Sequence, residues 1–180
     1  MESTLTKVKT GFSRNGIQLL VFCSFILTLA GCGVYSFTGA SIPPEAKTIS
    51  ILNFPNKSEL VQPSLSQTFT EKLKDRFSSQ TSLNLVPRNG DLHIEGEITG
   101  YTTEPVAISG EQTAQLIRLK ITVNVRFINK FDEKASYEST FSRYYDYPSN
   151  LDLRQVEEEA ISNISDALVE DIFNKSVVNW

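Results

Sequence analysis

The sequence contains few of the residues from which metal and redox sites are built. Its 180 residues include two cysteines and one histidine, His93. Two cysteines form at most one disulfide, which excludes a disulfide-stapled scaffold. Zinc sites usually take three or four ligands, drawn largely from Cys and His. The sequence also lacks a nucleophile-elbow serine motif and a phosphate-binding loop. These absences argue against an enzyme and predict no metal and no cofactor.

Positive charge is also sparse. The chain has 17 Lys and Arg residues against 21 Asp and Glu residues, which gives a net charge of −4. A nucleic-acid-binding surface needs clustered positive charge, so we expect no nucleic-acid partner. Hydrophobic residues make up 40% of the chain and charged residues 21%, as in globular proteins. The length fits one ordinary domain with an appended segment.

The apolar run near the N-terminus, residues 17–30, is too short for a membrane span, which requires roughly 20 residues. It follows three basic residues, Lys7, Lys9 and Arg14. A basic segment, an apolar segment and small residues in this order are typical of a secretory signal. The alternative is a transmembrane anchor with a buried cysteine. That anchor would need a longer apolar run and a basic stop-transfer cluster after residue 32, and the sequence has neither.

The end of this pattern, Leu29-Ala30-Gly31-Cys32, resembles the bacterial lipobox. In a lipobox the signal is cut before the cysteine, whose thiol and new amino group are then acylated. We therefore predict a lipoprotein signal peptide at residues 1–31, cleavage between Gly31 and Cys32, and lipidation of Cys32. Two or more acyl chains anchor a protein stably where one chain does not.

Residues 32–46 are predicted to form an acylated lead-in, which Pro43 and Pro44 keep out of a regular helix. At about 3.3 Å per extended residue, this lead-in reaches at most ~50 Å from the lipid. Residues 1–31 carry three basic residues and one acidic residue, so the rest of the chain has a net charge of about −6. A domain this acidic needs its acyl anchor or a local basic patch to stay at an anionic lipid surface.

The first half of the domain at residues 47–180 has the pattern strand, helix, strand. Residues 47–54 include three β-branched residues, Thr48, Ile49 and Ile51, and are followed by Pro55, which favours a short buried strand. A helix should run from Ser64, with Gln67 completing a capping box, to about Ser79. Residues 82–86 predict a short strand. The helix has an apolar stripe with i+4 spacing: Leu65, Phe69, Leu73 and Phe77.

The second half alternates between apolar and polar residues over three segments, 91–101, 114–130 and 135–147, with a loop through Pro105 and Gly110. Strands with one apolar face form an antiparallel sheet that is covered on one side. A second amphipathic helix is predicted at residues 151–175. The fold class is therefore α+β: a two-layer sandwich of two amphipathic helices on a mainly antiparallel sheet of four to five strands.

Three basic residues, Arg118, Lys120 and Arg126, share the polar face of one predicted strand. They are candidates for contact with an anionic ligand, because Arg suits phosphate groups well. The alternative is cross-strand pairing with Glu95 and Glu97. Three nearby tyrosines are either core or interface residues, and the pattern leaves both alternatives open: Tyr144, Tyr145 and Tyr147.

Several stretches of the chain resemble lipoproteins of the LptE family. These are "CGVYSFTGASIPPEAKTISILNFPN", "LSQTFTEKLKDRF" and "LHIEGEITGY", and the likeness extends from Cys32 to the final helix. The resemblance implies a non-enzymatic lipoprotein of the outer membrane, facing the periplasm or lying inside a barrel lumen. Such a protein plugs an LptD-like β-barrel and assists the transport and assembly of lipopolysaccharide. Cys32 is the one residue to which the resemblance assigns a role: it carries covalent acyl lipid such as palmitate. The resemblance implies no cofactor.

Two other functions fit some of the same features. The chain could be a periplasmic lipoprotein adaptor or an auxiliary subunit of a transporter, since a lipid anchor and a small α+β domain serve either role. A small hydrolase or metal-binding lipoprotein would depend on His93 together with Glu95 and Glu97. The simpler interpretation of these three residues is a solvated strand face.

Overall fold

The computed structural model describes residues 42–106 and 115–178. The chain divides into two units, residues 1–37 and 38–180, and all described residues belong to the second unit. The predicted signal peptide (1–31), its cleavage site at Gly31 and Cys32, and most of the predicted lead-in lie outside the described residues. Those predictions therefore stay predictions.

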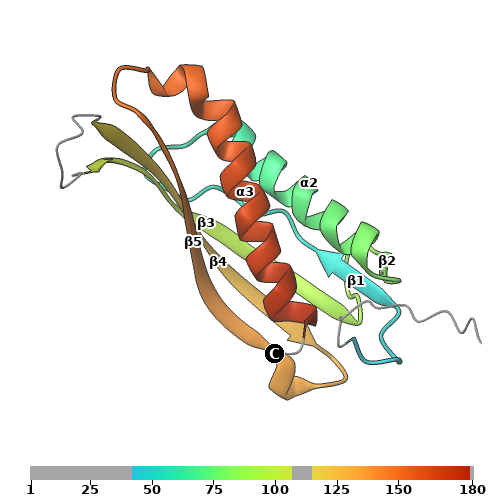
Figure 1. The fold of residues 1–180 in the computed structure, drawn as a ribbon. Coiled ribbons are helices and arrows are strands. Elements are labelled where there is room, and N and C mark those ends of the chain that lie inside the picture. The colour runs from blue at the N-terminus through green and yellow to red at the C-terminus, as the bar shows by residue number, and fades with distance from the viewer. Residues whose placement is uncertain (1–41, 107–114, 179–180) are drawn as a thin grey trace, which may run out of the picture. The chain divides into compact units, whose positions relative to one another are not determined.

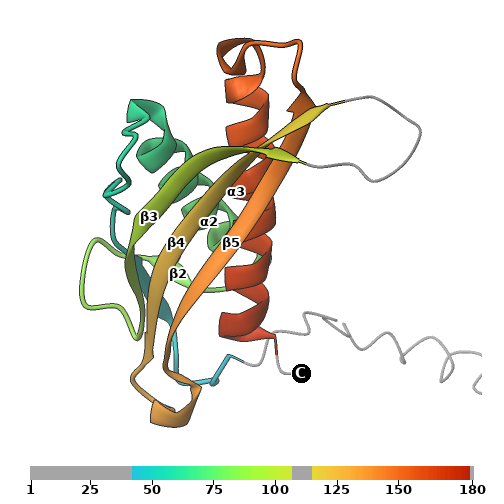
Figure 2. The same cartoon turned by 90° about the vertical axis from the view of Figure 1, so that its left-hand side faces the viewer.

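Two helices pack on one face of a five-stranded sheet, and the other face of β3, β4 and β5 is left uncovered by them (Figures 1 and 2). This architecture confirms the predicted α+β class. The elements in chain order are β1 (Thr48–Ile51), α2 (Pro63–Gln80), β2 (Asn84–Leu85), β3 (Leu92–Val106), β4 (Leu116–Asn129), the 3-10 helix η1 (Glu133–Ala135), β5 (Tyr137–Pro148) and α3 (Leu153–Val177). β1 and β2 are shorter than predicted.

The sheet is mixed, with the strand order β2-β1-β3-β4-β5. β1 runs parallel to both β2 and β3, whereas the long pairings β3–β4 and β4–β5 are antiparallel. The predicted antiparallel character thus holds for most of the paired residues. β1 and β2 are parallel because helix α2 connects them, and such a crossover brings the chain back in the same direction.

The core lies between the sheet and the two helices, and the predicted stripes fill it. Each residue of the α2 stripe has 0% exposure, and β4 contributes every second side chain, from Leu119 to Phe127, at 0–1%. Fully burying one such side chain contributes roughly 1.5–3 kcal/mol. Two edge-to-face phenylalanine pairs, each with ring centroids 5.1 Å apart, fix the packing: Phe54–Phe69 and Phe77–Phe173.

The N-terminal cap of α2 differs from the one predicted from the sequence. α2 is capped by Gln62, whose side chain accepts from Ser64 N at 3.3 Å, so the predicted capping box at Ser64 is wrong. Pro63 occupies the first helical position, where its missing N–H costs nothing. In α3 a capping box does form, between Asp152 and Gln155.

β3 also extends further than predicted and contains an irregularity. It continues through Pro105 to Val106 instead of ending near Tyr101. In the described residues no strand pairs with its other edge beyond Ile98, so a proline without an N–H is tolerated there. A bulge between Ile98 and Gly100 adds one residue, which turns Tyr101 into the core at 4% exposure.

Candidate functional site

The candidate site is the face of β3, β4 and β5 that is turned away from the helices, which we call the outer face. Alternate residues of each strand point to it, and nearly all of them are polar. β3 supplies His93, Glu95, Glu97, Thr102 and Glu104; β4 supplies Arg118, Lys120, Thr122, Asn124 and Arg126; β5 supplies Glu138, Thr140, Ser142, Tyr144 and Asp146.

Arg118 is held firmly on this face. Its Nε and Nη2 donate to the two carboxylate oxygens of Asp146, both at 2.7 Å, and its guanidinium carbon lies 3.6 Å from the ring centroid of Tyr144. The hydrogen bonds raise the pKa of Arg118 and lower the pKa of Asp146. The geometry is the two-pronged pairing that Arg forms with carboxylates. Arg118 therefore has a partner within the chain.

Lys120 lies next along β4, between Thr102 of β3 and Tyr144 of β5. It is exposed, and among the described residues it forms no ion pair. Of the three basic residues in the predicted row, Lys120 is therefore the one that has no carboxylate partner among the described residues. An ammonium group in this position is available to a group outside the chain.

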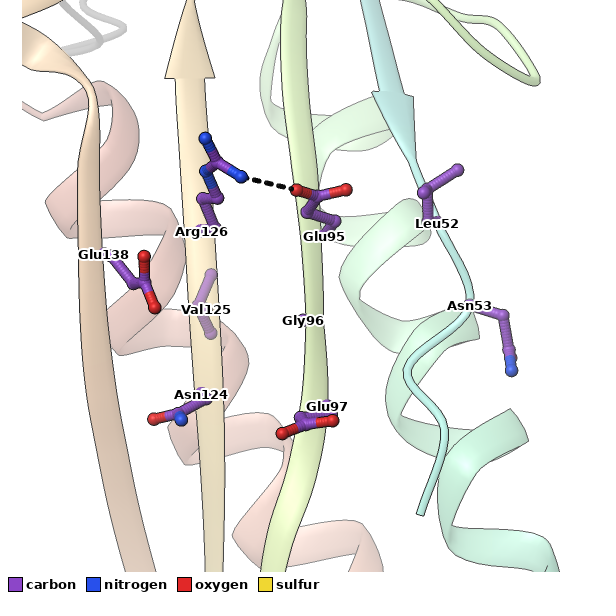
Figure 3. Close-up of a pocket in the computed structure, with 9 residues that line it drawn as sticks. All are labelled: Leu52, Asn53, Glu95, Gly96, Glu97, Asn124, Val125, Arg126 and Glu138. Carbon is purple, nitrogen blue, oxygen red and sulfur yellow. Dashed lines mark hydrogen bonds and ion pairs between the residues drawn. The ribbon is translucent and has the colours of Figure 1, made fainter. Parts of the chain in front are cut away.

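Arg126 pairs with Glu95 across β3 and β4 at 3.4 Å, as the cross-strand alternative predicted for that residue. The pair borders a shallow hollow of about 360 Å³ that reaches from Leu52 and Asn53 to Glu138 (Figure 3). The lining mixes polar and apolar groups and includes three carboxylates, Glu95, Glu97 and Glu138.

His93 links two strands instead of facing an open cleft. Its Nδ1 lies 2.7 Å from Ser50 Oγ on β1, and its Nε2 lies 3.3 Å from Glu95 Oε2. Ser50 has 0% exposure and also accepts from Gly90 N at 3.0 Å. A hydroxyl enclosed in this way cannot reach a substrate. In the part of the chain that the structure describes, no three His, Cys, Asp or Glu side chains are placed to hold a metal ion.

The three predicted core or interface tyrosines of β5 differ in burial. Tyr147 is a core residue at 3% exposure, whereas Tyr144 is 57% exposed on the outer face. Tyr145 is partly buried, and its hydroxyl donates to Glu159 of α3 at 3.1 Å. The sequence pattern does not identify Tyr144 and Asp146 as partners of Arg118. Period-two alternation of β5 would have placed both on the same face as each other, but only the strand register sets them beside Arg118.

The family of the chain follows from a direct comparison. The family model LptE, described as lipopolysaccharide-assembly, matches residues 46–176. The chain belongs to the LptE family. The match covers almost the whole described domain, including β1, both helices and the outer face. LptE proteins are non-enzymatic envelope lipoproteins of lipopolysaccharide assembly. Among the described residues, no helix is both long enough and apolar enough to cross a membrane.

No curated protein matches the chain. Solved structures to which the chain is similar include a minor lipoprotein from Acinetobacter baumannii, at 17% identity and a TM-score of 0.48, with 72% of this chain and 91% of that chain covered. Another is uncharacterized lipoprotein B from Nitrosomonas europaea, at 14% identity and a TM-score of 0.45, with 79% and 88% covered.

Proposed function

We propose that this LptE-family protein is an outer-membrane lipoprotein that plugs an LptD-like β-barrel during lipopolysaccharide transport and assembly. The outer face of the sheet carries the proposal. A barrel lumen is polar, so a plug needs a polar, well-ordered surface to pack against its wall. The outer face provides ordered polar groups of this kind, because Arg118 and Arg126 lie in ion pairs with Asp146 and Glu95, and Thr140 donates to Asn124 across β4 and β5.

The anchor in this proposal is acyl lipid on Cys32, after removal of residues 1–31. The described domain begins only ten residues later, at Ile42. At about 3.3 Å per extended residue, this distance is at most ~33 Å. The domain therefore stays within reach of the membrane in which its barrel partner lies.

The partner contact is tested by photo-crosslinking in cells that contain the cognate barrel. A photo-reactive residue at Lys120, on the outer face, is expected to give a crosslink to a protein of the size of a large β-barrel. The same residue at Asp75, on the exposed side of α2, is the matched control and should crosslink less. Recovery of the lipoprotein without a barrel from the Lys120 position would contradict the plug. A crosslink to an inner-membrane transporter would favour the adaptor function instead.

A contact with lipopolysaccharide is proposed at Lys120, because Arg118 and Arg126 already have carboxylate partners. Lys120→Glu should lower the recovery of lipopolysaccharide with the purified protein at least several-fold. Lys74→Glu, the same charge change on α2, is the control. Equal loss in both variants would indicate a general charge effect and would contradict a site at Lys120.

A further inference from the structure

The turn between β4 and β5 presents an aromatic side chain to solvent. Phe131 is 48% exposed at the tip of this turn. The Asn129 side chain, on a residue that is 7% exposed, accepts from the backbone N–H groups of Phe131 (2.9 Å) and Asp132 (3.1 Å). Ser136 Oγ accepts from Asn129 N at 2.9 Å. Because these bonds fix the backbone on both sides of the tip, the exposure of Phe131 is built into the turn.

The chain leads toward Cys32 from the same end of the domain. Residues 42–44 line a cavity of about 470 Å³ together with the turn (Asn129, Asp132 and Lys134) and the end of α3. Ala46 is 5% exposed, and its N–H donates to the Pro43 carbonyl at 2.9 Å. Both views place this segment, η1 and the end of α3 at one end of the domain (Figures 1 and 2). The lead-in thus leaves from a fixed point beside the turn.

Two lysines, Lys130 and Lys134, flank the aromatic tip, and neither forms an ion pair among the described residues. Lys130 Nζ donates to the Asn89 carbonyl at 2.9 Å, and its charge is one of the causes that lower the pKa of Asp91, after the hydrogen bonds from Lys47 N and Thr48. The Asp132 carboxylate accepts from Lys134 N at 3.1 Å as the cap of η1. The turn therefore joins an exposed aromatic tip to two lysines with long apolar stems and to two carboxylates, Asp132 and Glu133, so its charges balance.

We propose that this end of the domain rests on the lipid surface that holds the acyl chains, with Phe131 inserted at the headgroup level. Amphipathic lysine side chains lie along apolar surface and keep their charged ends at the headgroup phosphates. An exposed aromatic side chain beside lysines with long apolar stems suits the boundary between headgroups and acyl chains. The inference rests on the proposed anchor at Cys32, because that anchor brings this end of the domain to the membrane.

Tryptophan fluorescence tests the contact. F131W is made in the full chain with the natural tryptophan removed by Trp180→Phe, then purified from host membranes and mixed with phosphatidylethanolamine–phosphatidylglycerol vesicles. We expect a blue-shifted emission that brominated lipids quench at least two-fold. Y144W in the same background is the control, because Tyr144 is also exposed but lies on the outer face. Its emission should change little. Equal quenching of both variants, or an unshifted F131W emission, would overturn the proposal.

Vesicle flotation separates this inference from the proposed anchor. If the protein floats with the vesicles but the F131W emission is unshifted, the anchor stands and the turn contact fails. If the F131W emission shifts while Cys32 carries no acyl chain, the turn contact stands and the anchor fails. A protein that neither floats nor shows a shift contradicts both. Crosslinking from Lys120 reports on the barrel partner independently of either result.

Discussion

The two faces of β4 differ sharply although their residues alternate along one strand. On the inner face, Ile121, Val123 and Phe127 are at 0–1% exposure beneath the helices. On the outer face, Arg118 and Arg126 bond sideways to carboxylates on the neighbouring strands. Inner contacts join the sheet to the helices, whereas outer contacts stay within the sheet. The free energy of folding should therefore come mainly from the inner face, and the outer face is left available for a partner.

The largest expected effect separates the two faces directly. Phe127→Ala should cost about 3–5 kcal/mol of unfolding free energy, because it leaves a cavity in a closely packed core. The ring that it removes lies 5.5 Å from that of Tyr137. Asn124→Ala, on the outer face of the same strand, should cost only about 0.5 kcal/mol. Denaturant unfolding of the purified protein measures the unfolding free energy of both variants. Similar losses in the two variants would contradict the idea that the inner face supplies most of the stability.

A pair of glycines on β3 sharpens the same contrast. A Cβ on Gly96, on the inner side, would lie 2.6 Å from the Phe54 ring, whereas a Cβ on Gly100 would meet Thr122 at 3.2 Å. Gly96→Ala should therefore cost about 1–3 kcal/mol through overpacking. Gly100→Ala should cost less, since the nearest atoms belong to the Thr122 side chain at 3.2 and 3.3 Å and need to move by only a few tenths of an ångström. Thermal unfolding of the two variants decides the order, and a larger loss at Gly100 would refute it.

The smallest expected effect concerns the outer face alone and depends on pH. The hydrogen bonds from Arg118 lower the pKa of Asp146. A carboxyl group with a lowered folded-state pKa adds stability above its unfolded pKa, about 3.9, and loses that stability as the pH falls through the folded-state value. Asp146→Asn should thus be slightly less stable than the parent at pH 7, and the difference should vanish in acid.

Unfolding curves at pH 7 and pH 3 give this difference. Asp75→Asn is the matched control, since Asp75 is exposed on α2 and forms no ion pair among the described residues. A difference for Asp146→Asn that grows in acid would contradict the role of the Arg118 pair.

Part of this structure was predictable because side-chain periodicity reports which face is buried. The i+4 stripe of α2 and the alternation of β4 both matched the buried residues. The capping of α2 was not predictable in the same way, since Gln62 and Ser64 are both polar and Pro63 decides between them. The bulge after Ile98 was also missed, because an added residue changes the period and is fixed only by pairing with β4.

For the candidate site, the sequence identified the basic row and the partner of Arg126, Glu95, but not the partner of Arg118. The sequence pattern was compatible with two roles for Arg118, Lys120 and Arg126, namely contact with an anionic ligand and cross-strand pairing. The structure pairs Arg118 with Asp146 and Arg126 with Glu95, and pairs Lys120 with no described carboxylate. This distinction depends on strand register, which sets residues far apart in the chain opposite one another.

The sequence by itself determined the α+β class, the two helices and the polar character of the outer face, because hydrophobic period is a local property of the chain. Only the tertiary structure decided the place of β1 between β2 and β3, the partners of the basic residues, and the position of Phe131 beside the start of the lead-in. Each of these depends on contacts between distant segments, and such contacts form only when the helices and the sheet bury their apolar faces together.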